Sequence, residues 1–281
     1  MQYSRDGLTF DVAAAGPPDA ADVVVLLHGF PQDRTAWDRL TPALLAAGLR
    51  TLAPDQRGYS PGARPAGRRA YRLAELVADV VALIDAVGVS QVHLVGHDWG
   101  GGVAWALAAR HPDRLASLTV LSTPHPAAMA WAAAHADQGL RSWYMLAFQL
   151  PHLPERVLAR RIRDFLRATG LPEADVERYA ARFGTPEALA GPLGWYRALP
   201  LAGRGEAGHG ITVPTTYLWG MGDPALGRAA ALRTARHVRA DYRFVQLDAG
   251  HWLPETHPEP VAAAILARIP HPGPPRDHIV A

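Results

Sequence analysis

The stretch Val95-Gly96-His97-Asp98-Trp99-Gly100-Gly101 decides the fold, because it joins a short apolar strand pattern to a helical pattern that runs to about Arg110. It matches the turn G-x-nucleophile-x-G, in which a strained backbone presents one reactive side chain at the edge of a sheet. Small residues on either side of the nucleophile avoid a steric clash. The central residue is Asp98, so the turn predicts a carboxylate nucleophile.

The sequence before and after this turn alternates between strand patterns and helical patterns. Apolar runs at residues 23–27 (VVVLL), 49–53 and 118–121 predict strands, and residues 37–46 and 71–87 predict helices. Strands separated by helices favour a parallel sheet with crossover connections. The predicted fold class is α/β, with a mostly parallel central sheet flanked by helices.

A long segment of helical patterns, broken by proline and glycine, interrupts this alternation. The alternation resumes with runs at residues 213–219, 241–247 and 258–269. We therefore expect one α/β core in two parts, residues 1–123 and 211–281, with a helical insertion at residues 124–210. The tail from Pro270 is rich in proline and is expected to be loosely ordered.

The composition excludes several kinds of chemistry. The 281 residues include no Cys, and all 28 basic residues are Arg because the sequence contains no Lys. A thiolate nucleophile, a disulfide, a thiolate metal site and an iron–sulfur cluster are therefore excluded. A Schiff-base lysine and the lysine of a phosphate-binding loop are excluded as well.

The charge and hydropathy patterns bear on partners and location. The formal net charge is only +2, and the basic stretch at residues 156–167 is expected to be a solvated helix face. We therefore expect no binding to nucleic acid. No apolar run approaches the ~18 residues of a membrane span, and the first ten residues lack the pattern of a secretory signal. We expect a cytoplasmic protein, either a monomer or a homodimer.

Three further features place reactive groups at strand ends. His28-Gly29-Phe30-Pro31 follows the first buried strand pattern, where a loop that holds an oxyanion should lie. Asp223 follows the strand pattern that ends at Trp219, and His251 follows the one that ends at Leu247. The chain order of nucleophile, acid and histidine predicts a catalytic triad.

These motifs together resemble the epoxide hydrolase group of the α/β-hydrolases, and the similarity covers nearly the whole chain. The resemblance implies the α/β-hydrolase fold, with the helical insertion as a cap over the active site. The strings that carry it are HGFPQD at 28–33, DQRGYS at 55–60, GHDWGG at 96–101, STPHP at 122–126, SWYMLAFQLP at 142–151, GPLGWYR at 191–197 and AGHW at 249–252.

The resemblance also implies roles for two cap tyrosines and for one peptide bond. In this group two cap tyrosines donate to the epoxide oxygen, and the matching positions are Tyr144 in WYMLAFQ and Tyr196 in WYR. The bond between Phe30 and Pro31 is expected to be cis, which turns the Phe30 amide toward the site. Only ~5% of X-Pro bonds in folded proteins are cis.

The residue types predict a two-step reaction. Attack of Asp98 on an sp³ carbon would leave an alkyl ester. His251 would then activate water against that ester, while Asp223 orients the imidazole. Backbone N–H groups of Phe30 and Trp99 would hold the oxyanion. The product would be a vicinal diol, and neither a metal nor an organic cofactor is needed.

The substrate is expected to be a small apolar epoxide in an apolar pocket. The predicted pocket residues are Pro31, Trp37, Trp143, Phe148, Trp195 and Trp252. Trp143 and Trp195 are equally consistent with a role in the core of the cap. Arg34 occupies a position where some epoxide hydrolases have an aromatic residue. The sequence therefore does not predict the shape and polarity of the pocket wall at this position. Asp55 and Arg57 are interpreted as an ion pair that braces a loop.

Two other functions are compatible with parts of this pattern. A haloalkane or haloacid dehalogenase shares the Asp nucleophile and the ester, but it uses halide or carboxylate donors at the places where this chain has Phe30 and Trp99. Trp99 is compatible with both groups. The tyrosine pair favours epoxide hydrolysis. A ligand-binding protein without catalytic activity could reuse the same fold, although the complete set of reactive residues favours an enzyme.

Overall fold

The computed structural model describes residues 1–201 and 210–269, so the tail predicted from Pro270 lies outside the described residues. Its centre is one sheet with the strand order β1-β2-β4-β3-β5-β6-β7-β8. The six strands β3 to β8 run parallel to one another. β1 and β2 are antiparallel to each other, and β2 is antiparallel to β4. This arrangement confirms the predicted α/β class. The strands are β1 (Gln2–Arg5), β2 (Leu8–Ala15), β3 (Val23–Leu27), β4 (Arg50–Pro54), β5 (Val92–His97), β6 (Leu115–Leu121), β7 (Thr215–Gly220) and β8 (Tyr242–Leu247).

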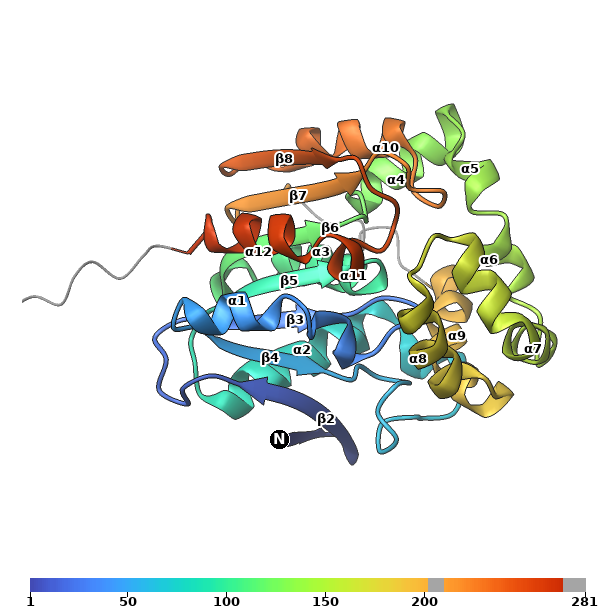
Figure 1. The fold of residues 1–281 in the computed structure, drawn as a ribbon, viewed down its shortest axis with the longest axis horizontal. Coiled ribbons are helices and arrows are strands. Elements are labelled where there is room, and N and C mark those ends of the chain that lie inside the picture. The colour runs from blue at the N-terminus through green and yellow to red at the C-terminus, as the bar shows by residue number, and fades with distance from the viewer. Residues whose placement is uncertain (202–209, 270–281) are drawn as a thin grey trace, which may run out of the picture.

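Helices cover both faces of the sheet (Figure 1). On one face α1 (Thr41–Ala46) contacts α12 (Pro258–Leu266), and on the other α2 (Leu73–Val87) contacts α3 (Trp99–Arg110). Successive side chains of a strand point to opposite faces. In β3, Val23, Val25 and Leu27 accordingly belong to one apolar cluster, and Val24 and Leu26 to the other. A central strand buried on both sides must therefore be apolar throughout, which explains the run VVVLL.

The predicted helix at residues 37–46 is shorter than expected. A 3₁₀ turn covers Arg34–Trp37, and α1 begins only at Thr41. The turn starts at Asp33, whose side chain accepts the N–H of Thr35 at 2.8 Å. Such a cap satisfies a donor that would otherwise lack a partner, so the chain turns here before it enters the helix.

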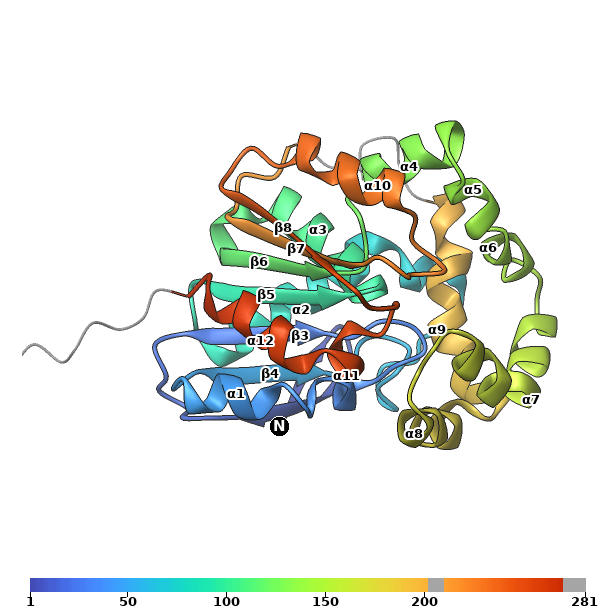
Figure 2. The same ribbon diagram turned by 45° about the horizontal axis from the view of Figure 1, so that its top comes forward.

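Between β6 and β7 the chain forms a series of helices. Beyond α4, these lie past one end of the sheet, with α8 and α9 nearer to it and α6 and α7 farther out (Figures 1 and 2). α4 instead packs on α10 (Arg228–Arg233), which lies after β7. We therefore propose that the cap proper begins after α4. The helices are α4 (Pro126–His135), α5 (Gln138–Arg141), α6 (Tyr144–Ala147), α7 (Leu153–Ala168), α8 (Glu173–Phe183) and α9 (Pro186–Ala198).

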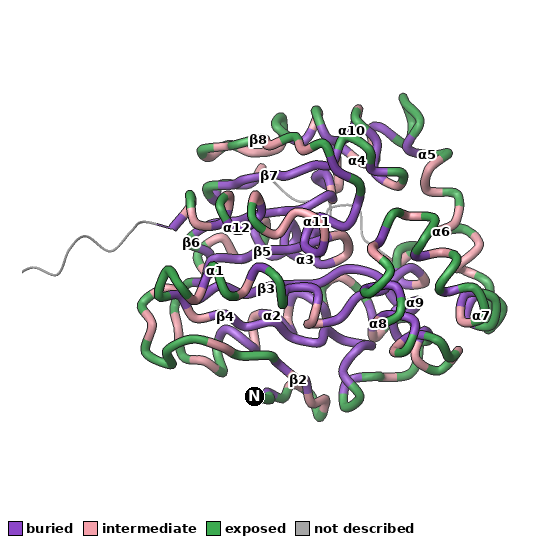
Figure 3. The backbone as a smooth tube through the Cα atoms, viewed as in Figure 1, coloured by how far each residue is buried: buried purple, intermediate pink, exposed green. Residues whose placement is uncertain are grey.

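The inner helices of this segment are held to the core by polar contacts. Arg182 of α8 makes ion pairs with Asp33 at 3.1 Å and with Asp55 at 2.8 Å. Trp195 of α9 donates its indole N–H to the carbonyl of Arg57 at 2.8 Å. Figure 3 shows how the helices of this segment differ in burial: α9 is largely buried, whereas α7 presents a mostly exposed surface. No described helix is both long and apolar enough to cross a membrane.

The turn between β5 and α3 depends on close backbone packing. Asp98 has φ 50° and ψ −120°, a conformation that non-glycine residues rarely adopt. A Cβ atom at Gly96 would lie 2.3 Å from the carbonyl oxygen of Gly100, and one at Gly100 would lie 2.1 Å from that of Leu27. Only glycine lets α3 approach the sheet closely enough to hold this strained turn.

We predict opposite effects from two alanine substitutions within α3. Gly100→Ala forces backbone apart and should lower the free energy of unfolding by about 1–3 kcal/mol. At Gly102 a Cβ would meet only the Trp99 side chain, at 3.9 Å. Gly102→Ala should therefore raise the free energy of unfolding by up to about 1 kcal/mol through helix propensity. Urea denaturation of both variants measures the difference. Equal stability of the two would contradict this account of the turn.

Candidate active site

The turn places Asp98 against the loop that follows β3. The N–H of Phe30 donates to Asp98 Oδ1 at 2.8 Å. The bond between Phe30 and Pro31 is cis, as the sequence resemblance implied. A Cβ atom at Gly29 would lie 2.4 Å from Asp98 Cβ, so a glycine is needed for the loop and the carboxylate to meet. Trp99 is the first residue of α3, where amides have no acceptor within the helix, and its N–H is thus suited to be a second donor.

His251 lies between two carboxylates. Its Nδ1 is 2.8 Å from Asp223 Oδ2, and its Nε2 is 3.6 Å from Asp98 Oδ2. The other oxygen of Asp223 accepts the N–H groups of Ala225 at 2.8 Å and Leu226 at 3.0 Å. Asp223 is therefore fixed in position, and the three residues predicted for the triad come together at the carboxyl edge of the sheet.

The charges of this cluster shift the pKa values of its members. Burial alone would lower the pKa of His251, but the charges and hydrogen bonds of Asp223 and Asp98 outweigh it and raise the pKa to about 10. Burial alone would raise the pKa of Asp98, but the hydrogen bond and charge of His251 lower it. Near neutral pH the site therefore holds an ionised Asp98 beside an imidazolium.

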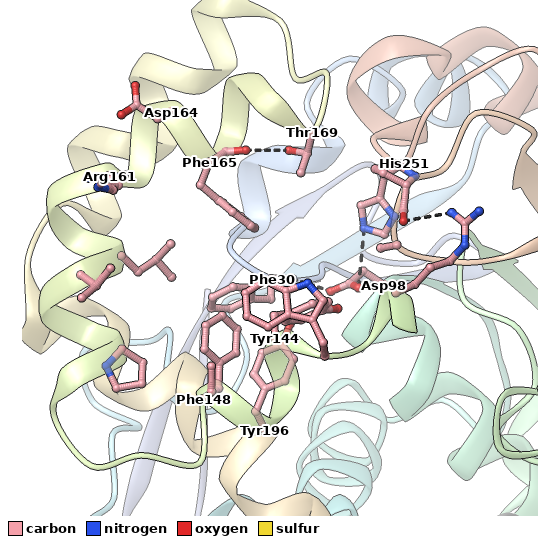
Figure 4. A pocket seen from close by; sticks show the side chains of 18 of the residues that line it. Phe30, Asp98, Tyr144, Phe148, Arg161, Asp164, Phe165, Thr169, Tyr196 and His251 are labelled. Carbon is pink, nitrogen blue, oxygen red and sulfur yellow. Dashed lines mark hydrogen bonds and ion pairs between the residues drawn. The ribbon is translucent and has the colours of Figure 1, made fainter. Parts of the chain in front are cut away.

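Tyr144 and Tyr196 lie on the cap side of the same cavity, beside Phe30 and Asp98 (Figure 4). Their ring centroids are 6.2 Å apart, and Tyr196 packs edge-on against Phe30 and Trp99. Burial, and to a lesser extent the negative charge of Asp98, raises the pKa of both phenols. Both tyrosines therefore stay protonated and can act as hydrogen-bond donors to an oxygen atom near Asp98.

These groups open into a cavity of about 680 Å³. Its wall includes three of the predicted pocket residues, Trp143, Phe148 and Trp252. The sequence did not reveal the contribution of α7, whose Leu153, Val157 and Phe165 extend the apolar wall away from Asp98. Apolar residues at helical spacing were the available signal, but the spacing alone does not say which face meets a cavity.

Three predicted pocket residues lie elsewhere. Trp37 is 1% exposed and packs in the core beneath α1, on the far side of the sheet from α2 and α3. Trp195 is also 1% exposed and contacts Tyr59 and Trp99. Consecutive helical residues point about 100° apart, so Tyr196 can face the cavity while Trp195 faces the core. Pro31 is buried in the loop, and neither it nor Arg34 lines the cavity.

The predicted ion pair between Asp55 and Arg57 is wrong. Arg57 instead pairs with Asp79 of α2 at 2.7 Å. Asp55 pairs with Arg34 at 3.2 Å and with Arg182. Arg34 thus holds a loop carboxylate, and its positive charge is compensated there rather than at the cavity.

A buried hydrogen-bond network behind the triad was not anticipated. Gln32 Oε1 accepts the N–H of Gly29 at 2.7 Å and lies 2.8 Å from Nδ1 of His97, while His97 Nε2 lies 2.9 Å from the carbonyl of His251. Gln32 Nε2 and the Tyr179 hydroxyl both donate to Glu255 at 2.7 Å. Burial and the neighbouring charge of His251 lower the pKa of His97 to about 4.

No cluster of His, Asp and Glu among the described residues has the arrangement of a metal site. A carboxylate on a strained strand-to-helix turn, paired with a histidine and an acid from later strands, defines an α/β-hydrolase with aspartate in the nucleophile position. Comparison with known proteins agrees with this class.

A model of the alpha/beta hydrolase fold family matches residues 22–258. AB hydrolase superfamily protein YfhM of Bacillus subtilis is 38% identical, over 94% of this chain and 95% of its own length. Epoxide hydrolase A of Mycobacterium tuberculosis is 34% identical, over 93% of this chain and 94% of its own length. The crystal structure of epoxide hydrolase A from Mycobacterium thermoresistibile has a TM-score of 0.83 at 30% identity, covering 96% of this chain and 97% of its own. The chain belongs to the α/β-hydrolase fold family and, within it, to the epoxide hydrolase group, which confirms the resemblance found in the sequence.

The pKa of His251 should depend on the charge of Asp98. Asp98→Asn removes one of the two carboxylates that raise it, so we expect the pKa of His251 to fall below its value of about 10. Titration of the imidazole by NMR measures the change, with Asp113→Asn as the control because Asp113 is exposed and not in contact with the site. An unchanged pKa in Asp98→Asn would show that Asp98 does not stabilise the imidazolium.

Proposed function

We propose that this member of the epoxide hydrolase group converts apolar epoxides to vicinal diols through a covalent ester on Asp98. The observation that carries the proposal is that one cavity contains both a carboxylate that can attack an epoxide carbon and phenols that can donate to the epoxide oxygen. An ionised carboxylate lies at its inner end, and two protonated phenols, Tyr144 and Tyr196, face it from the cap. The relatives named epoxide hydrolase A support the same reaction.

In the first step Asp98 opens the epoxide ring. Its Oδ1 is held by the N–H of Phe30, so Oδ2 is the oxygen free to attack a ring carbon. The C–O bond of the strained ring breaks, and the departing oxygen takes a proton from one tyrosine while the other tyrosine donates a hydrogen bond to it. The imidazolium of His251 then returns a proton to the tyrosinate, directly or through water. The result is a hydroxyalkyl ester and a neutral His251.

In the second step His251 becomes a base because the ester carries no charge. Loss of the Asp98 carboxylate removes one of the two charges that raise the pKa of His251, and Asp223 continues to hold Nδ1–H. Nε2 takes a proton from water, and the hydroxide adds to the ester carbonyl. Phe30 N–H then stabilises the developing oxyanion, with Trp99 N–H as the proposed second donor. Expulsion of the diol restores the Asp98 carboxylate and leaves His251 protonated, as at the start.

The two alternatives predicted from the sequence have less support. The Phe30 ring has no hydrogen-bond donor for a halide, whereas the indole N–H of Trp99 is compatible with both reactions, so the tyrosine pair carries the distinction. The phenols suit an oxygen leaving group. A binding role alone would not explain why an imidazolium is held between two carboxylates.

Every step uses side chains, backbone amides, water and substrate. We therefore include in the proposal that the enzyme needs neither a metal nor an organic cofactor. We also propose that it acts in the cytoplasm, as a monomer or a homodimer, on a small apolar epoxide and without nucleic acid.

Replacement of the base should trap the ester. In His251→Gln, Asp98 can still attack, but water is no longer activated, so we expect an adduct whose mass exceeds that of the protein by one epoxide. Mass spectrometry after incubation with styrene oxide, followed by peptide mapping, should place the adduct on Asp98. His135→Gln is a matched control, because His135 is exposed on α4, and it should turn over without accumulating ester.

A second variant makes this experiment decisive. Asp98→Asn combined with His251→Gln should show neither adduct nor turnover. If His251→Gln itself gave neither adduct nor diol with a broad panel of epoxides, while remaining folded, the proposed mechanism would be wrong.

A further inference from the structure

Large apolar side chains are exposed mainly in one short part of the cap. Among the described residues ten such side chains are highly exposed, and six of them fall within residues 140–157. Leu140 and Leu146 are 80% and 78% exposed, and Trp143 is 67% exposed. We call these six residues the rim patch: Leu140, Trp143, Leu146, Leu150, Leu153 and Val157.

Four of the six residues of the rim patch belong to the wall of the active-site cavity. Trp143, Leu150, Leu153 and Val157 are exposed and also line the cavity. Leu153 and Val157 are four residues apart on the first turns of α7, so they share one face of that helix. A side chain that lines a cavity and also reaches solvent lies at its opening. The cavity therefore opens through an apolar surface.

Positive charges without partners lie beside the rim patch. Arg156, Arg160 and Arg161 are exposed on α7, and within residues 1–201 and 210–269 none of them makes an ion pair. Arg163 and Arg167 of the same helix do pair, with Glu177 at 2.9 Å and with Glu173.

Figure 4 places Arg161 and Asp164 on α7, at the end of the cavity away from Asp98. Asp164 is exposed, and Glu155 is buried and bound by Arg197. The surface around the rim patch therefore carries a net positive charge.

We propose that the rim patch docks on the surface of membranes that contain anionic lipids. Trp and Leu side chains suit the boundary between headgroups and acyl chains, and cationic side chains beside them bind anionic headgroups. The docked orientation places the mouth of the cavity against the bilayer. Membrane docking does not depend on the proposed function. Only the further step, in which epoxides dissolved in the lipid enter the cavity, rests on the proposed function.

A second copy of the chain fits this surface less well. In a two-fold interface the same patch occurs on both partners. The unpaired arginines of each copy would then face like charges, and on α7, which is described throughout, Asp164 is the acidic side chain left to compensate them. Like charges brought together oppose association, whereas an anionic lipid surface complements them.

Cosedimentation of the full chain with vesicles tests the proposal. We expect binding to vesicles of phosphatidylcholine and phosphatidylglycerol, weaker binding to phosphatidylcholine alone, and weakening by salt through screening. Arg156→Gln with Arg160→Gln should weaken binding on the order of 10-fold, from the contribution of each charge near an anionic surface. The matched control is Arg163→Gln with Arg167→Gln, which removes two paired charges from the same helix and should have a much smaller effect.

The apolar part of the patch is tested in the same way. Leu140→Ser with Leu146→Ser should also reduce vesicle binding, whereas Leu232→Ser, an exposed leucine of α10, should not. None of these residues lines the cavity, so hydrolysis of a water-soluble epoxide without vesicles should match that of the unaltered protein. This assay separates failure of docking from failure of the proposed function.

Two results would overturn the proposal. One is equal binding of the unaltered protein to neutral and anionic vesicles, or no binding to either. The other is a dimer in sedimentation equilibrium that the Leu140 and Leu146 substitutions dissociate, because the occupant of the patch would then be a second copy.

Discussion

The interaction on which the site depends is the imidazolium of His251 held between the carboxylates of Asp98 and Asp223. The Asp223 carboxylate is buried and that of Asp98 is partly buried, and a buried charge is costly unless it is paired. The shared cation compensates both, and it keeps Asp98 ionised. In the proposed mechanism this arrangement changes with the reaction, because esterification of Asp98 would remove one of the two charges that keep His251 protonated. In that mechanism a single ion cluster supplies the nucleophile of the first step and the base of the second.

The sheet makes this cluster possible by bringing together residues that are far apart in the chain. Asp98, Asp223 and His251 follow β5, β7 and β8, and parallel strands bring their carboxyl ends to one edge. The cap then closes the other side of the cavity with Tyr144 and Tyr196. Behind the triad, the network from His97 through Gln32 to Glu255 and Tyr179 ties the nucleophile turn to α8 of the cap.

The parts of this account that could be predicted from sequence are those that depend on local pattern. The glycines around Asp98, the run VVVLL and the positions of Asp223 and His251 after strands all follow from short stretches, and the fold class is confirmed. Contacts between distant residues could not be predicted in this way. Glu255 and Gln32 are 223 positions apart, and the partners of Asp55 and Arg57 depend on how α2 and α8 pack. The prediction of Trp37 and Trp195 as pocket residues was wrong because the sequence does not distinguish an aromatic side chain in the core from one in a cavity wall. β1 and β2 were not predicted, since the alanine-rich end of β2 lacks the usual strand residues.

The central claim is that Asp98 forms a bond to the substrate rather than directing water at it. A single turnover in water labelled with oxygen-18, with enzyme in excess over epoxide, tests this most directly. Hydrolysis of the ester passes the original Asp98 oxygen to the diol and leaves the label in the Asp98 carboxylate. We therefore expect unlabelled diol and a labelled peptide that contains Asp98. Label in the diol after the first turnover, with none in Asp98, would contradict the account and would mean that water attacks the epoxide directly.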